Sequence, residues 1–92
     1  MLTQELALEK LHQDIIRRNL SKNTMKAYMN KTKLFLEYID RPADDLTAYD
    51  VRRYLLHLRK DLERTPNTIN LNICALRFFF AATLGRPLSL DR

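Results

Sequence analysis

The sequence predicts an all-α fold, a small four-helix bundle, and three observations lead to it. The 92 residues include one glycine and three prolines, which leaves little material for hairpin turns. Hydrophobic residues make up 46% of the chain and recur at helical rather than alternating spacing. Typical N-cap residues, Ser21, Thr47 and Thr65, precede three of the periodic segments. A chain of this length is expected to form one domain.

The first half of the chain predicts two helices. The first is expected over residues 3–18, with Leu8, Leu11 and Ile15 along its core side. After a break at residues 19–20, Ser21 is expected to cap a second helix that reaches Ile39. One face of that helix carries residues spaced by about 100° each: Met25, Tyr28, Met29, Thr32, Phe35, Leu36 and Ile39. Residues 40–45, with a proline and three aspartates, are expected to be a connector.

The second half predicts two more helices. Thr47 and Asp50 have capping-box spacing, so a third helix is expected there, with Val51, Tyr54, Leu55, Leu58 and Leu62 facing the core. Thr65-Pro66 is a typical start for a fourth helix, which is expected to end at Gly85. Its core side holds Ile69, Ile73, Leu76, Phe80 and Leu84. Leu71 and Phe78 form a second apolar stripe, so either this helix is central and buries both, or both contact something outside the chain.

No enzyme-type site is expected in this sequence. Catalysis needs a convergent acid, base and nucleophile. Tyr54 falls on a core stripe, while Arg53 and His57 fall on a face expected to be solvated and basic. Cys74 is expected to be an inert, partly buried thiol, and with two separated histidines it leaves no metal-ligand spacing. We therefore expect no catalytic residue, no metal and no cofactor.

The location expected for the chain is a reducing, prokaryotic cytoplasm. The lone cysteine excludes an internal disulfide. No apolar run approaches the ~20 residues of a membrane span, and the first residues resemble no secretory leader. We expect no membrane partner and a monomer in isolation.

Charge favours an anionic partner. The net charge is +5, and its distribution is uneven. Residues 15–36 contain six basic side chains and no acidic one, and residues 65–90 contain no acidic one either. The acids gather in residues 5–14 and 37–63. The second and fourth predicted helices are therefore the ones suited to nucleic acid.

The outer faces of these two helices carry side chains that bind DNA in other proteins. On the second, an exposed strip of small and amide side chains is bordered by lysines, which neutralise phosphates, while asparagine can contact base edges. The fourth has a comparable strip with three outward polar residues. The candidate DNA-binding residues are Lys22, Asn23, Thr24, Lys26, Ala27, Asn30, Lys31, Lys33, Asn67, Thr68, Asn70 and Arg77. A soluble, slightly basic surface without a ligand fits the same pattern equally well.

Three stretches resemble the core-binding, SAM-like domain of tyrosine recombinases (phage-type integrases). The stretches occur in order and with the family's spacing, and the resemblance as a whole spans about residues 5–85. The stretches are Leu20-Ser21-x-x-Thr24-x-x-x-Tyr28, Asp45-Leu46-Thr47-x-x-Asp50-Val51-x-x-Tyr54-Leu55 and Thr65-x-x-Thr68-Ile69-Asn70-x-x-Ile73 with the following Cys74-Ala75-Leu76-Arg77-Phe78-Phe79. Leu84-Gly85-Arg86-Pro87-Leu88 departs from the Asn-Pro pair common in the family at that point.

The resemblance implies site-specific binding of double-stranded DNA, in a clamp completed by a separate catalytic domain of the same parent chain. The second and fourth helices would face the major groove, with Thr24 on a phosphate and Asn23, Ala27 and Asn30 toward the groove. Thr68, Asn70 and Arg77 occupy the matching positions of the fourth helix. Other recombinase protomers would be partners in a synaptic complex. Residues 1–88 would form the core-binding domain and residues 89–92 the start of a linker.

Two other classes remain open on the residues alone. A helix-turn-helix regulator needs a tight turn between two helices, whereas these connectors are longer and lack the turn glycine. A protein-interaction module of sterile-alpha-motif type has a similar bundle shape. Such a module would not need two acid-free helices with outward asparagines and lysines.

Overall fold

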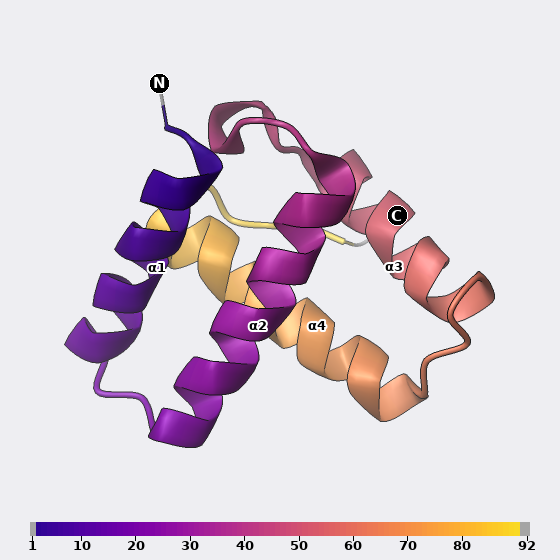
Figure 1. Cartoon of the computed structure of the whole chain (residues 1–92), viewed down its shortest axis with the longest axis horizontal. Helices are drawn as coiled ribbons and strands as arrows, with labels where there is room; N and C mark the ends of the chain where they lie inside the picture. Colours follow the sequence, from indigo (N-terminus) through magenta and orange to yellow (C-terminus); the bar gives the residue numbers. More distant parts are fainter. Residues whose placement is uncertain (1, 91–92) are drawn as a thin grey trace.

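Residues 2–90 are described by a computed structural model, and their elements confirm the all-α prediction (Figure 1). The four α-helices are α1 (Gln4–Arg17), α2 (Lys22–Ile39), α3 (Ala48–Lys60) and α4 (Pro66–Phe78). A 3-10 turn, η1 (Ala43–Asp45), interrupts the predicted connector, and a π-helical turn, η2 (Phe79–Thr83), continues α4. Residues 2–90 contain no strand and no helix with the length and apolar character needed to cross a membrane.

The helices begin where a threonine or serine caps them. At each of the four starts the side-chain oxygen accepts a hydrogen bond from the backbone N–H three residues on, at 3.1 to 3.4 Å. These bonds satisfy donors that a helix start otherwise leaves unpaired. The caps are Thr3, Ser21, Thr47 and Thr65. Asp50 returns the bond at the start of α3, which completes the predicted capping box.

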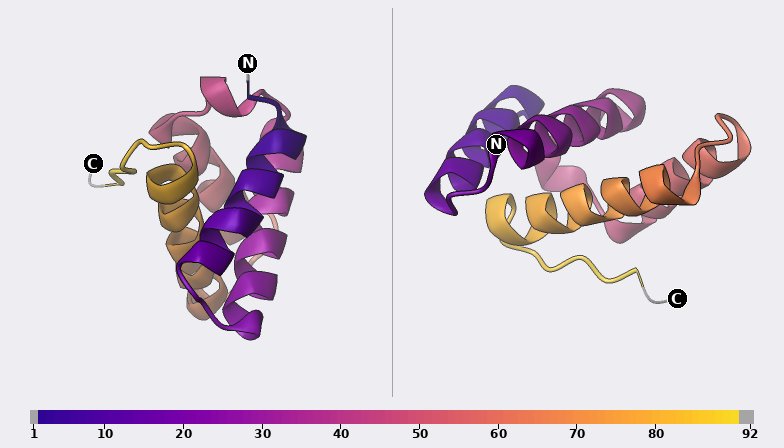
Figure 2. Two further views of the ribbon diagram at one scale, coloured as in Figure 1. Left: turned by 90° about the vertical axis from the view of Figure 1, so that its left-hand side faces the viewer. Right: turned by 90° about the horizontal axis from the view of Figure 1, so that it is seen from below.

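The helices are stacked in two layers. Figure 2 shows α1 and α2 side by side in one layer, with α4 crossing on the other side of the core. In Figure 1, α3 lies to one side of this stack, and the tail after Gly85 runs behind α4 toward α3. Arg86 fixes the base of the tail by donating to the carbonyls of Leu46 and Ala43 at 2.8 and 3.1 Å. Leu88 and Leu90 pack half-buried against the core.

Phe35 joins three of the helices at the centre of the core. Its side chain is fully buried on α2. Its ring centroid lies 5.4 Å from Tyr54 of α3 and 6.5 Å from Phe80 of η2, which are ordinary distances for favourable aromatic pairs. The α2 stripe predicted from helical spacing thus faces the core, with Thr32, Phe35 and Leu36 buried along it.

The prediction for Leu62 is wrong. The last helical residue of α3 is Lys60, and the side chain of Leu62 is 43% exposed. Because the helix ends at Lys60, Leu62 lies in the turn that reverses at Glu63 (φ 51°) and does not follow the stripe. The spacing that placed Leu62 inside assumed that the helix continued for two residues beyond Lys60.

The fourth helix ends at Gly85 as predicted, where the backbone turns left-handed (φ 69°), but its last turn is not a regular α-helix. After Phe78 the backbone widens into a π turn, closed by the bond from Leu84 N–H to the Phe79 carbonyl at 3.1 Å. Within this turn Phe79, Phe80 and Thr83 are all buried. A regular α-helix would spread three consecutive phenylalanines over 200° of its surface. The wider turn instead lets two of them enter the core together.

The π turn also brings Thr83 to a buried carboxylate on α1. Asp14 is 2% exposed, and it accepts from the Thr83 hydroxyl at 2.9 Å and from the Arg17 guanidinium at 2.8 Å. A buried carboxylate without such donors would be costly. This contact fastens the two ends of the bundle, which are 69 residues apart in sequence.

Valine substitutions at the two buried threonines, Thr83 and Thr32, distinguish the contribution of hydrogen bonding to stability from that of packing. Thr83→Val removes a donor to a buried carboxylate and should lower the free energy of unfolding by about 1.5–3 kcal/mol. Thr32→Val is the matched control, because the buried Thr32 hydroxyl has no hydrogen-bond partner among the described residues. It should leave stability unchanged or raise it. Urea denaturation of both variants checks this, and equal destabilisation by the two would contradict the assignment.

Candidate nucleic-acid interface

The two acid-free helices cross each other, and aromatic side chains pack at the crossing. The Tyr28 and Phe78 ring centroids lie 5.6 Å apart, and the Arg18 guanidinium lies 5.7 Å from the Phe78 centroid. Phe78 is half-buried by these contacts, whereas Leu71 is 37% exposed. Neither alternative offered for the second stripe is therefore correct. Leu71 and Phe78 lie on the edge of α4 that meets α2, and α2 covers only Phe78.

On α2, the predicted DNA-binding residues divide into two groups. Five are exposed on the outer side: Lys22, Asn23, Lys26, Asn30 and Lys33. Thr24, Ala27 and Lys31 are half-buried along the edge toward α4. Thr24 lies in the first turn of the helix, where its oxygen accepts from the Ser21 hydroxyl at 3.0 Å. Its hydroxyl hydrogen remains free to donate to a phosphate.

The predicted residues of α4 do not all lie on one side. Asn67, Asn70 and Arg77 are exposed. Asn70 lines a shallow hollow with Arg59, Arg64, Pro66 and Ile69. Thr68 is half-buried and lines a different pocket that it shares with Lys31 of α2. The structure thus brings Lys31 and Thr68 together and leaves Asn70 outside that pocket.

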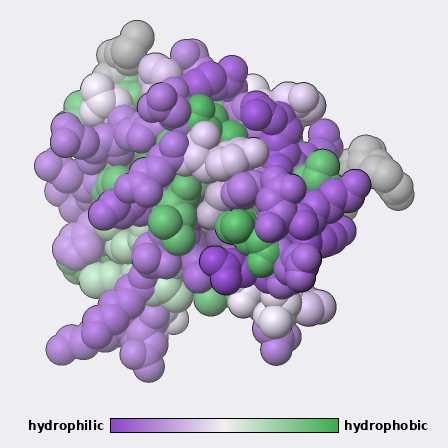
Figure 3. Space-filling view, turned by 45° about the vertical axis from the view of Figure 1, so that its right-hand side comes forward, coloured by the Kyte–Doolittle hydropathy of each residue, from purple (hydrophilic) through white to green (hydrophobic). Residues whose placement is uncertain are grey.

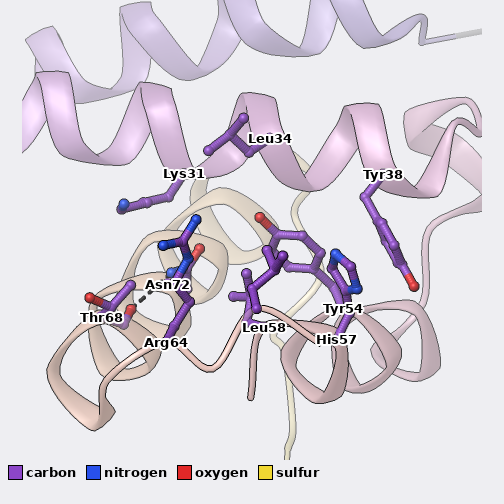
Figure 4. Close-up of a pocket in the computed structure, with 10 residues that line it drawn as sticks. Lys31, Leu34, Tyr38, Tyr54, His57, Leu58, Arg64, Thr68 and Asn72 are labelled. Carbon is purple, nitrogen blue, oxygen red and sulfur yellow. Dashed lines mark hydrogen bonds between the residues drawn. The ribbon is translucent and has the colours of Figure 1, made fainter. Parts of the chain in front are cut away.

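The shared pocket has a volume of about 490 Å³ and lies between α2, α3 and the start of α4 (Figure 4). One half has apolar and aromatic walls, and the other half is polar and basic. Figure 4 shows Lys31 descending from α2 while Arg64 rises from the α3–α4 connection toward the same space. The lining residues are Lys31, Leu34, Tyr38, Tyr54, His57, Leu58, Leu62, Arg64, Thr68 and Asn72.

Sequence reasoning missed Arg64 and Asn72. Arg64 precedes a helix cap, and helical spacing does not place the side chains of a connector. Asn72 is buried (2% exposed), with its amide nitrogen donating to the Thr68 carbonyl at 2.8 Å and its amide oxygen unpaired. An asparagine within a helix interior is the one feature that could have indicated it, because asparagine is unfavourable there without a partner.

Two further expectations need correction. His57 does not belong to a solvated basic face: its side chain is 23% exposed, and its ring stacks on Tyr38 with centroids 4.4 Å apart. Its Nδ1 lies 2.9 Å from the Asp61 carboxylate. Cys74 is exposed rather than partly buried. It lies one turn before Phe78, on the edge of α4 that is near Tyr28 of α2.

Two tyrosines, Tyr28 and Tyr54, have phenol pKa values raised by burial. Burial raises the pKa of Tyr28 above its ordinary value of 10.0, and an electrostatic contribution from the nearby Cys74 adds to the shift. Burial also raises the pKa of Tyr54, with Glu37 adding to the shift and Arg64 opposing it. Both phenols are therefore held protonated, the reverse of what a nucleophile requires. Among residues 2–90, no group of three or more His, Cys, Asp or Glu side chains could hold a metal ion.

The raised pKa of Tyr54 predicts how stability depends on pH. A group whose pKa is higher in the folded state stabilises fully below its unfolded pKa, and this contribution is lost as pH rises through the folded pKa. The loss of this stabilisation therefore begins near pH 10.0, the ordinary pKa of tyrosine, and continues at higher pH. Tyr54→Phe retains the ring and should reduce the alkaline loss of stability. Denaturation midpoints between neutral pH and pH about 11 test this, and an unchanged alkaline loss would contradict it.

On the side of the domain that carries α3, the exposed apolar side chains form separate small patches (Figure 3). Figure 3 brings this side forward, and hydrophilic side chains separate the hydrophobic ones. The exposed large apolar residues include Leu34, Leu56 and Leu62. A protein-docking face usually has a larger continuous apolar area than these patches provide.

The sequence pattern of the family described as "Phage integrase, N-terminal SAM-like domain" matches residues 7–90. The chain belongs to this family. A curated relative, "Putative integrase/recombinase y4qK" of Sinorhizobium fredii (strain NBRC 101917 / NGR234), is 38% identical over 88 residues. The match covers 91% of this chain and 29% of the relative.

For this phage-integrase N-terminal domain, the family match confirms the resemblance found in the sequence. The matched range includes α2, α3 and α4 entirely and most of α1. The chain spans under a third of the length of the relative it matches, and the shared part is the SAM-like region rather than a catalytic domain.

Proposed function

We propose that this domain binds double-stranded DNA through α2 and α4, as the non-catalytic N-terminal part of a site-specific recombinase. The observation that carries the proposal is the crossing of the two acid-free helices. Ring contact between Tyr28 and Phe78 holds them together, so their outward lysines and asparagines lie on adjoining surfaces. Two such surfaces can follow the phosphates on either side of a groove.

The charge on α2 remains available to a ligand. The three ion pairs within residues 2–90 join Arg17 to Asp14, Arg41 to Asp50 and His57 to Asp61. None of them uses a lysine of α2. Lys22, Lys26 and Lys33 are exposed and can release counterions when they neutralise phosphates.

In the whole recombinase, DNA cleavage and joining would belong to a catalytic domain of the same parent chain. The relative's much greater length and its printed name support this division. Protomers of the recombinase would then meet on DNA in a synaptic complex within the cytoplasm. An isolated N-terminal domain lacks the phosphate contacts of the other half of the clamp, so it would bind weakly and with little sequence preference.

The first test is the salt dependence of binding to a short mixed-sequence duplex. If about four to six phosphates are neutralised, log K should fall against log salt with a slope of about −3.5 to −5.5. Fluorescence anisotropy over a series of salt concentrations measures this. Affinity that does not change between low and high salt would refute the proposal.

The second test places the contact on α2. Asn30→Glu introduces a negative charge at the exposed centre of the outer strip, so the affinity for DNA should fall at least tenfold at low salt. Gln13→Glu is the matched control, because it makes nearly the same chemical change at an exposed position on α1. It should weaken binding much less. Equal losses in the two variants would mean that only net charge matters and that α2 is not the contact.

A further inference from the structure

Two cations line the same pocket, and within residues 2–90 no acidic side chain pairs with either. Lys31 and Arg64 take no part in the ion pairs of residues 2–90. Both side chains line the pocket, Lys31 from α2 and Arg64 from the α3–α4 connection (Figure 4). Like charges in a partly enclosed space repel each other more strongly than they would in open water. An anion between them would turn this repulsion into attraction.

The floor of the pocket holds an acceptor without a donor. The amide oxygen of Asn72 is buried and unpaired, while its amide nitrogen is occupied by the Thr68 carbonyl. Arg64 lines the same pocket, although no hydrogen bond joins its guanidinium to this amide oxygen in the free domain. A guanidinium has five N–H donors, so it can bond to an amide oxygen and to an anion at the same time. Asn72 is therefore suited to orient Arg64.

The backbone holds Arg64 at the edge of the pocket. Its N–H donates to the Leu58 carbonyl at 2.9 Å, which ties the connection back onto α3. Glu63, one residue earlier, has the left-handed conformation that reverses the chain. Thr65, one residue later, caps α4. Arg64 is thus fixed between two conformational constraints rather than carried on a loose loop.

Thr68 supplies a neutral donor on the same side. Its oxygen accepts a hydrogen bond from the Thr65 hydroxyl at 3.1 Å, which leaves its own hydroxyl hydrogen free. Thr68 lies in the first turn of α4, where the helix dipole also favours negative charge. Lys31, Arg64 and Thr68 together offer two charged donors and one neutral donor to a single small anion.

We propose that Lys31, Arg64 and Thr68 bind one backbone phosphate of DNA in this pocket, with Asn72 as a positioning residue for Arg64. This rests on the proposed function, and it adds a site that the outer strip of α2 does not contain. A DNA phosphate fits better than an acidic peptide, because the basic half of the pocket lies where the two acid-free helices meet. The apolar walls would exclude water from one side of the phosphate and strengthen these contacts.

The decisive comparison removes one positive charge at a time. Arg64→Ala and Lys31→Ala should each lower the affinity for the mixed-sequence duplex about tenfold or more and flatten the salt slope by about one unit. Arg53→Ala is the matched control: Arg53 is exposed on α3, with its guanidinium 5.9 Å from the Tyr49 ring centroid, outside the pocket. It should weaken binding much less and leave the slope unchanged.

The role of Asn72 needs a readout of Arg64 itself. In Asn72→Leu, the heteronuclear NOE of the Arg64 Nε–H group should fall, and the affinity for DNA should decrease while the salt slope stays near that of the wild type. Asn72→Asp retains an acceptor and should keep Arg64 ordered without DNA. A thermal melt confirms that each variant is folded. An unchanged NOE in Asn72→Leu would overturn the positioning role.

The outcomes separate this site from the proposed function. If the wild-type domain shows no salt-dependent binding, the proposed function fails. If the wild type binds but Arg64→Ala and Arg53→Ala are indistinguishable, the function stands and the phosphate site is refuted. If inorganic phosphate or polyglutamate shifts the Arg64 Nε resonance while duplex DNA does not, the pocket serves another anion and the proposal is overturned.

Discussion

Phe35 determines where the other functional parts of this domain lie. Its fully buried ring contacts Tyr54 on α3 and Phe80 after α4, so one side chain sets the position of α2 against both helices. Lys31 and Tyr38 lie about one turn before and after it on the same helix, toward the same side. Once Phe35 is in place, both are brought to the pocket that α3 and α4 close. The basic pocket is thus a geometric consequence of the core.

The fold uses its buried carboxylates for structure and keeps them away from the proposed DNA face. Asp14 joins α1 to the π turn, and Asp50 completes the cap of α3 while it also pairs with Arg41. Each takes at least one arginine donor, so each buried negative charge is compensated locally, as its desolvation requires. The π turn belongs to the same arrangement, since it brings Thr83 to Asp14.

Much of the fold was predictable from the sequence because capping residues and helical spacing depend on local sequence. Caps at Ser21, Thr47 and Thr65 fixed three of the helix starts, and helical spacing identified the buried face of α2. The features that the sequence did not predict arise where tertiary contacts overrule helical spacing. The π turn depends on two phenylalanines entering one core, and His57 is covered by a tyrosine from another helix. The pocket is formed by three segments that are distant in sequence. Helical spacing could place Lys31 and Thr68 on their own helices, but it could not predict that the two residues line the same pocket.

The structure also changes how the charge pattern should be counted. The sequence assigns six basic residues to residues 15–36, but Arg17 is paired with Asp14 and Arg18 lies over the Phe78 ring. Arg17 is therefore engaged within α1, and Arg18 is engaged in a contact between the end of α1 and α4. The four lysines of α2 have no such partner within residues 2–90, and Arg64, which lies outside both acid-free stretches, faces one of them. A lysine can neutralise a phosphate at little cost when no internal partner must be given up. The free cations, rather than the total number of basic residues, therefore determine how many phosphates this domain can neutralise.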